Sequence, residues 1–239
     1  MLELAGLTKC YGRHKVVDDL TFSCGPGEVL GFLGPNGAGK STTMKMVTGF
    51  VPPTSGTAVV CGHDILSGTI EARRHIGYLP EGAPLYPDMT PRQFLEFIAD
   101  VRGLEGDTRR SRIAEVTALL HLQPVLDQAT DTLSKGFKRR VGLAQAILHD
   151  PDVLILDEPT DGLDPNQKHE VRELIRSMSA AKLIVISTHI LEEVEAVCSR
   201  AIIIANGRLL TDETPAALAA RGDGDLDRVF RDITSGGTS

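Results

Sequence analysis

Gly34-Pro35-Asn36-Gly37-Ala38-Gly39-Lys40-Ser41, with Thr42 after it, is the stretch that decides the fold of this 239-residue chain. It matches the pattern GxxxxGK[ST] at every fixed position. The apolar residues 28–33 before it predict a strand, and residues 39–50 predict a helix that Pro52-Pro53 ends. In this context the glycines let backbone N–H groups converge on phosphate oxygens, and the helix N-terminus adds a partial positive charge. The stretch therefore predicts a phosphate-binding loop.

The polar side chains at the end of this loop have distinct expected roles. Lys40 is expected to reach the β- and γ-phosphates of a nucleotide and to take part in catalysis. The Ser41 hydroxyl is placed to bind Mg²⁺, with Thr42 beside it. A glycine-rich turn without a function is the alternative, but such turns rarely have a strand before them and a helix after them.

A second candidate element is the apolar run at residues 153–156, which Asp157 and Glu158 follow. Parallel α/β sheets present their functional groups at the carboxyl ends of strands. Neighbouring residues of a strand point to opposite faces, so the two carboxylates are expected to have different roles. Asp157 is suited to hold Mg²⁺, and Glu158 can polarise an attacking water. A solvated acidic pair is the alternative, which the upstream phosphate loop disfavours.

The rest of the chain alternates strand and helix patterns. Its composition is that of an ordinary globular protein, with 41% hydrophobic and 24% charged residues. Asn206-Gly207 is typical of a β-hairpin turn. Strands are expected at residues 2–8, 16–23, 57–61, 76–79, 183–187, 202–205 and 208–210, and helices at residues 91–102, 108–122, 137–149 and around 171–178.

This order of elements indicates the α/β class. We expect a P-loop NTPase core with a mostly parallel sheet, an N-terminal antiparallel β-subdomain and an inserted α-helical subdomain. Residues 1–239 form one domain in this interpretation. Residues 1–89 and 150–212 form the core with the β-subdomain, residues 90–149 the helical subdomain, and residues 213–239 the C-terminal helices and tail.

Charge and side-chain spacing argue against several other classes of protein. The net charge of −7 argues against a protein that binds nucleic acid over its whole surface. The four cysteines have neither metal-ligand spacing nor a CxxC pair, so they are expected to be reduced thiols. Six histidines show no ligand spacing and are expected at the surface or in supporting positions. These residues are Cys10, Cys24, Cys61 and Cys198, and His14, His63, His75, His121, His149 and His169.

The sequence contains no segment that resembles a secretory signal or a membrane helix. Its longest apolar runs are far shorter than the roughly 18 residues that a membrane helix needs. We therefore expect a cytoplasmic chain that reaches a membrane only through a partner.

Motifs downstream of the loop narrow the choice of family. Leu133-Ser134-Lys135-Gly136-Phe137, followed by Lys138-Arg139-Arg140, resembles the signature sequence of ABC-transporter ATPases. Gly162-Leu163-Asp164-Pro165 is similar to the D-loop of that family, and Ser187-Thr188-His189 is similar to its switch-histidine segment. Tyr11 occupies the place of the aromatic residue that stacks on adenine. The resemblance covers nearly the whole chain.

The resemblance implies Mg²⁺-dependent hydrolysis of ATP, with Glu158 as the base and His189 as a sensor of the γ-phosphate. It also implies a homodimer in which Ser134, Lys135, Gly136 and Asp164 of one copy meet the nucleotide held by the other. The dimer would work under a separately encoded integral membrane permease, on the inner face of the cell membrane. Residues 225–234 resemble the ending of ATPases that serve drug, polysaccharide and gliding-type exporters.

Helix chemistry supports the dimer independently of the resemblance. Ser134 and the Gly136 N–H lie at the start of a predicted helix, which makes a second anion-binding terminus in the chain. One nucleotide cannot easily use both termini within one copy, so a twofold arrangement is favoured.

Two positions depart from the family's pattern. Glu81 stands where most members have a glutamine that touches Mg²⁺ and senses the membrane subunit. A glutamate can still bind Mg²⁺ through oxygen, but it adds negative charge near the phosphates. We therefore expect that a chain with Glu81 still hydrolyses ATP, and that its coupling to the permease is altered. Lys135 replaces a glycine, and it either strengthens phosphate attraction or points to solvent.

Other functions remain as alternatives. A soluble ABC-type ATPase that acts on ribosomes or DNA is one, although the chain has a single cassette and no sustained heptads between Lys40 and Ser134. A P-loop kinase or GTPase would leave the signature motif and His189 unexplained. The basic cluster from Lys135 to Arg140 is expected to be a solvated or phosphate-facing helix start, and no nucleic-acid partner is expected.

Overall fold

A computed structural model describes residues 1–235 of the chain. The strands are β1 (Leu2–Tyr11), β2 (His14–Cys24), β3 (Val29–Leu33), β4 (Ser55–Val60), β5 (His63–Asp64), β6 (Ile76–Leu79), β7 (Val153–Asp157), β8 (Leu183–Thr188), β9 (Arg200–Ala205) and β10 (Arg208–Glu213). The helices are α1 (Lys40–Val47), α2 (Thr69–Arg74), α3 (Pro91–Val101), α4 (Gly106–Leu119), α5 (Lys135–Ile147), α6 (Pro165–Ser179), α7 (Leu191–Val197), α8 (Pro215–Arg221) and α9 (Leu226–Ser235), with 3₁₀ turns at Gln123–Val125 and Thr130–Thr132.

The central sheet has the strand order β10-β9-β3-β8-β7-β6. All its neighbouring strands run parallel except the β9–β10 hairpin. Every residue of β3, β6, β7 and β8 is buried, as expected for parallel strands covered on both faces. The carboxyl ends of β3, β7 and β8 therefore lie along one edge of the sheet. The sequence places its phosphate loop and its acidic pair at this edge.

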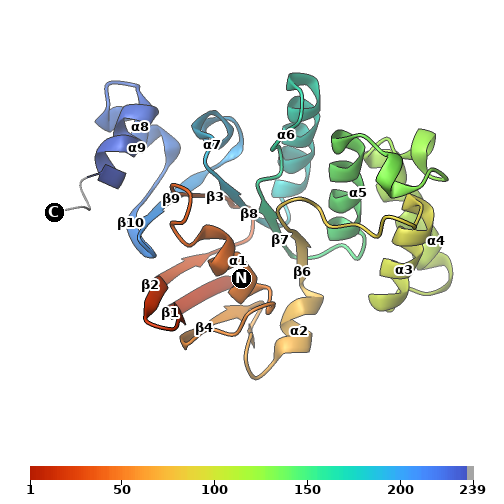
Figure 1. Ribbon diagram of the computed structural model, residues 1–239, viewed down its shortest axis with the longest axis horizontal. Helices are drawn as coiled ribbons and strands as arrows, with labels where there is room; N and C mark the ends of the chain where they lie inside the picture. Colours follow the sequence, from red (N-terminus) through yellow and green to blue (C-terminus); the bar gives the residue numbers. More distant parts are fainter. Residues whose placement is uncertain (236–239) are drawn as a thin grey trace.

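A second sheet, with the order β2-β1-β4-β5, is antiparallel throughout. Together with α1 it covers one face of the central sheet, in a core that includes Val153 and Ile155 of β7. The opposite face packs against helices α3 to α6, in a core that includes Leu154 and Leu156. This alternation along β7 follows the period of two of a strand. Figure 1 shows α3, α4 and α5 gathered at one side of the molecule and α8 and α9 at the other.

The structure confirms the expected fold class of a mostly parallel sheet, an antiparallel N-terminal sheet and intervening helices. Three short elements, β5, α2 and α7, were not expected, because each is too short to show a hydrophobic period. Helix α1 ends at Val47, before the expected residue 50. The reason is Gly49, whose positive φ of 74° belongs to the left-handed conformation that terminates helices.

The helices of residues 1–235 include none with the length and apolar character that a membrane crossing requires.

His149 links the end of α5 to the central sheet. Its Nε2 donates to the Ile76 carbonyl at 3.1 Å, and burial, followed by the charge of Arg102, lowers the pKa of the imidazole from 6.5 to about 4. The folded protein therefore holds His149 neutral at pH 5, whereas the unfolded chain protonates it.

This difference predicts how His149 affects stability. Above pH 6.5 the imidazole is neutral in both states, and as the pH falls from 6.5 towards 4 only the unfolded state gains a proton. The free energy of unfolding of the wild-type chain should therefore fall by about 1–3 kcal/mol through this group as the pH is lowered over this range. Urea unfolding of His149→Gln at pH 7 and pH 5 should show a smaller loss of stability than wild type. An equal loss in both proteins would contradict the assignment.

Candidate nucleotide-binding site

The loop between β3 and α1 leaves the start of the helix open. Gly39, the N-cap of α1, has a φ of 104°, and a Cβ there would meet the Val16 carbonyl at 2.6 Å, so only glycine fits. No side chain of residues 1–235 caps the first turn of α1. The N–H groups of that turn have no partner within the helix, so they are free to bind an anion.

Four other helices differ in this respect. Their first turns are closed by side-chain oxygens that accept a backbone N–H, at Thr90, Ser134, Asp164 and Thr214. Such a cap satisfies the orphan donors that a phosphate would otherwise bind. Helices α2, α4 and α7 also lack a side-chain cap, but their N-termini do not border a pocket with the loop, whereas the N-terminus of α1 does.

A pocket of about 250 Å³ opens over this helix start. It brings the loop together with Glu81, which follows β6, and with Glu158, which follows β7. The pocket is lined by Val16, Asn36, Gly37, Ala38, Gly39, Lys40, Ser41, Thr42, Glu81 and Glu158. Seven of the nine expected loop residues thus line one pocket; Gly34 and Pro35 contribute their carbonyls to the contacts of Lys40.

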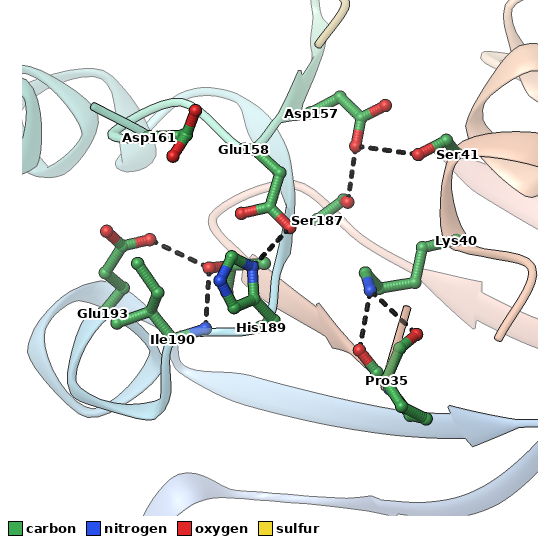
Figure 2. Close-up of polar contacts among 12 residues, drawn as sticks. Pro35, Lys40, Ser41, Asp157, Glu158, Asp161, Ser187, His189, Ile190 and Glu193 are labelled. Atoms are coloured by element: carbon green, nitrogen blue, oxygen red, sulfur yellow. Dashed lines mark hydrogen bonds and ion pairs between the residues drawn. The ribbon is translucent and has the colours of Figure 1, made fainter. Parts of the chain in front are cut away.

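Lys40 lies buried against the loop. Its Nζ donates to the Gly34 carbonyl at 2.6 Å and to the Pro35 carbonyl at 3.2 Å (Figure 2). Burial lowers the pKa of the ammonium, while Glu158, Asp157 and Glu81 act in the opposite direction. The cation therefore lies among three carboxylates, at a place where phosphate oxygens can replace the loop carbonyls as its partners.

Asp157 is positioned to share a cation with Ser41. Its Oδ1 accepts from Ser187 Oγ at 2.6 Å and from Ser41 Oγ at 3.4 Å. Its Oδ2 is buried and finds no hydrogen-bond partner among residues 1–235. A buried carboxylate oxygen without a partner is unfavourable unless a cation or a water satisfies it. The carboxylate and the hydroxyl are hard oxygen donors, so this pair fits Mg²⁺.

Glu158 and His189 form a polar pair beside the pocket. Glu158 Oε1 accepts from His189 Nδ1 at 2.9 Å, and Glu158 Oε2 is buried without a partner among the described residues. Glu158 has a φ of 50°, in the left-handed region that a glutamate rarely adopts. Such strain is typical of functional positions held by their surroundings. Figure 2 shows the Glu158 side chain turned towards His189, and the Asp157 side chain turned towards Ser41.

The segment that carries His189 is held by a buried polar contact. Thr188 Oγ1 donates to Glu193 Oε2 at 3.0 Å and accepts from the Ile190 N–H at 3.1 Å. Burial raises the pKa of the Glu193 carboxyl. This contact fixes the turn between β8 and α7, so that the His189 ring, with 51% of its side chain exposed, faces Glu158.

Arg139 corrects one expectation from the sequence. The basic cluster was expected to be a solvated or phosphate-facing helix start, but Arg139 is only 6% exposed. Its guanidinium donates to the carbonyls of Pro159 at 3.0 Å, Pro80 at 3.3 Å, Asp157 at 2.6 Å and Glu158. Burial lowers its pKa, yet an arginine stays charged. Arg139 thus ties α5 to the backbone that carries both acids.

The spacing of small residues around Arg139 indicates the inward turn of this side chain. Gly136, Arg139 and Gly142 are buried and follow one another at intervals of three along α5. The i, i+3 spacing therefore places Arg139 on the inward face. The other members of the cluster are paired at the surface, since Lys135 Nζ lies 3.0 Å from Asp161 and Lys138 Nζ donates to the Asp131 carbonyl at 2.9 Å.

The structure does not bring the signature residues to the pocket. Ser134 is the N-cap of α5 and accepts from the Phe137 N–H at 3.3 Å. Gly136 packs against α6, where a Cβ would meet Gln167 Nε2 at 2.5 Å. Lys135 makes the ion pair described above at the surface, with 63% of its side chain exposed. All three lie outside the pocket that the loop lines.

Asp164 and Tyr11 also lie outside that pocket. Asp164 is the N-cap of α6 and accepts from the Gln167 N–H at 3.0 Å. Tyr11 ends β1 with 53% of its surface exposed and has Lys9 Nζ 5.2 Å from its ring centroid. Its ring is therefore open to a stacking partner.

Comparison with known proteins identifies relatives of this chain. A family model described as ABC transporter matches residues 17–161. The Nod factor export ATP-binding protein I of Paraburkholderia xenovorans (strain LB400) is 40% identical over 231 residues, which cover 96% of this chain and 76% of that protein. The probable multidrug ABC transporter ATP-binding protein YbhF of Escherichia coli (strain K12) is 39% identical over 226 residues, covering 94% of this chain and 39% of that protein.

Solved structures agree with these relatives. One described as the ATP-binding subunit of an ABC transporter has a TM-score of 0.89 and 31% identity to this chain. The match covers 98% of this chain and 99% of the other.

The contacts of Arg139 predict a positioning role. Arg139→Lys keeps the positive charge but cannot serve four carbonyls at once, so the acids at the end of β7 should shift. Since small misplacements are costly, kcat for ATP hydrolysis should fall by about 10²-fold, with little change in KM for ATP. The matched control is Arg140→Lys, because Arg140 pairs with Glu170 instead. An unchanged kcat in a folded Arg139→Lys protein would contradict the role.

Proposed function

Because the chain belongs to the ATP-binding subunits of the ABC transporter family, we propose that it hydrolyses ATP to ADP and phosphate as a homodimer that drives a membrane permease. The observation that carries the hydrolytic part is the arrangement around the loop. An uncapped helix start, a buried lysine, a carboxylate with an unpartnered oxygen and a Glu158–His189 pair converge on one pocket.

The phosphates bind first to the loop. The N–H groups of the first turn of α1 and the Lys40 ammonium carry the positive charge that holds them. Ser41 and Asp157 are the residues to hold Mg²⁺, with Glu81 as a further oxygen donor at the pocket wall. Mg²⁺ held by these residues would supply neutralisation of the phosphate charge.

Glu158 is the base in this proposal. A water oxygen attacks the γ-phosphorus while the bond between that phosphorus and the β–γ bridging oxygen breaks, and ADP leaves with the bond's electron pair. Glu158 takes the proton of the water, either before or during attack. His189 contacts Glu158 Oε1 and orients it, and its exposed ring can reach the γ-phosphate.

The proposed composite site depends on the position of the signature residues away from the phosphate pocket of their own chain. Ser134 and Gly136 lie outside their own chain's pocket, so they are available to a nucleotide held by a second copy. Ser134 Oγ accepts the Phe137 N–H through a lone pair, which leaves its hydroxyl proton to donate to a phosphate oxygen. The Lys135 side chain lies against Gly162, two residues before Asp164, and Tyr11 is open to stack on adenine.

The relatives support a role in export. They are named for Nod factor export and for multidrug transport, and this chain matches them over nearly its whole length. We infer that the chain sits at the inner face of a membrane through a separately encoded permease, which selects the substrate. ATP then holds the two copies together, and loss of the γ-phosphate contact lets them separate.

Glu158→Gln tests the base directly. Glutamine keeps the shape of the side chain but cannot take a proton, so ATP hydrolysis should fall by about 10²–10⁴-fold. ATP binding should persist, and the variant should elute as a dimer with ATP and Mg²⁺ and as a monomer without them. The control is Glu173→Gln, at an exposed residue that pairs with Arg176 on α6. Turnover of Glu158→Gln at the wild-type rate would exclude Glu158 as the base.

Glu81 makes a prediction about affinity. Glu81 lines the phosphate pocket, so without Mg²⁺ its negative charge opposes ATP binding. Removing one charge a few ångströms from the phosphates in water-like surroundings is worth about 1 kcal/mol, so Glu81→Gln should bind Mg²⁺-free ATP about fivefold more tightly at low salt. Calorimetry should show this gain shrinking as salt rises. Glu71→Gln, at an exposed residue paired with Arg74, is the control. Unchanged or weaker binding of Mg²⁺-free ATP by Glu81→Gln would contradict this repulsion.

A further inference from the structure

Three side chains of different chemistry meet at a place far from the nucleotide pocket. Cys61 follows β4, His75 follows α2, and Asp152 precedes β7. One ligand atom from each lies within 4.8 Å of the others. Cys61 and His75 are half-buried, and Asp152 is exposed, so the group is reachable from solvent.

The backbone holds these positions by regular structure. The Val153 N–H donates to the His75 carbonyl at 3.0 Å, and Ile76 pairs with Val153 in the β6–β7 ladder. His75 and Asp152 are therefore neighbours at the ends of two paired strands. Cys61 comes from the antiparallel sheet, whose strand β4 ends beside them. The group thus bridges the two sheets of the molecule.

The His75 and Asp152 side chains are already oriented towards each other. His75 Nδ1 lies 2.6 Å from Asp152 Oδ2, and this contact fixes the plane of the imidazole. The His63 ring stacks on the His75 ring, with centroids 5.4 Å apart and an interplanar angle of 14°. The His63 ring therefore restricts the His75 ring from outside the group of three, as supporting residues do around histidines that bind metals.

The donor set selects a class of metal. A thiolate sulfur, an imidazole nitrogen and a carboxylate oxygen are the three ligand types that Zn²⁺ accepts, whereas Ca²⁺ and Mg²⁺ prefer oxygen alone. We propose that Cys61, His75 and Asp152 bind one Zn²⁺ ion, with a water molecule in the fourth position. Three protein ligands and a water make the four-coordinate geometry that zinc favours.

The site is distinct from the nucleotide pocket. Asp152 lies before the first residue of β7, and Asp157 is the last residue of that strand. At about 3.3 Å per residue, Asp152 and Asp157 are roughly 16 Å apart along the chain. Zinc at the far end would join the antiparallel sheet to the central sheet without entering the ATP site. An ion that binds the folded state alone stabilises it by linkage.

Cobalt substitution tests the proposal. The nucleotide-free chain, purified without a polyhistidine tag and stripped with a chelator, is titrated with Co²⁺ and then with Zn²⁺. Wild type should bind one Co²⁺ per chain, with a thiolate-to-cobalt charge-transfer band and the intense visible bands of tetrahedral cobalt, and Zn²⁺ should displace it. Cys10→Ser, at another half-buried free cysteine, should behave like wild type, whereas Cys61→Ser should lose the charge-transfer band.

A stability measurement provides a second readout. Zn²⁺ should raise the Tm of wild type and of Cys10→Ser, and it should leave the Tm of Cys61→Ser and His75→Gln unchanged. If Cys61→Ser does not fold, His75→Gln decides the question by the same cobalt spectrum and Tm shift. The proposal is overturned if wild type shows no thiolate band, or if the band and the Tm shift persist in Cys61→Ser or His75→Gln.

Discussion

The unpaired N–H groups at the start of α1 are the constraint on which the rest of the site depends. The loop can expose them because Gly39 adopts a conformation that brings it against the Val16 carbonyl, where no side chain would fit. The capped helices of the chain use Ser, Thr or Asp oxygens for the same donors. The first turn of α1 thus offers its N–H groups to an anion, and the carboxyl edge of the parallel sheet places Asp157 and Glu158 beside it.

The acids, in turn, depend on contacts from outside the central sheet. Arg139 of α5 binds the carbonyls of Asp157, Pro159 and Pro80, and so links the helical part of the chain to the backbone of both carboxylates. Since the signature residue Ser134 caps the same helix, a ligand that engages Ser134 would act on α5 and, through Arg139, on the backbone of Asp157 and Glu158. The buried Arg139 guanidinium is the contact that connects Ser134 and α5 to this backbone.

Local patterns predicted the fold and the loop well, because each depends on neighbours in the sequence. The strands around residues 76–79 and 183–187, and the position of Lys40 near Asp157 and Glu158, follow from hydrophobic runs and strand polarity. Contacts between distant segments were not predictable in the same way. The inward turn of Arg139 and the meeting of Cys61, His75 and Asp152 depend on how α5 and the two sheets pack, and linear spacing does not record that.

The central claim is that one nucleotide is held by the loop of one copy and by the signature of another. A crystal structure of the Glu158→Gln chain with ATP and Mg²⁺ tests it most directly. The account predicts phosphates on the first-turn N–H groups of α1, with the γ-phosphate within hydrogen-bond reach of Ser134 from the second copy. A triphosphate bound at the loop with Ser134 of every copy remote from it would contradict the account.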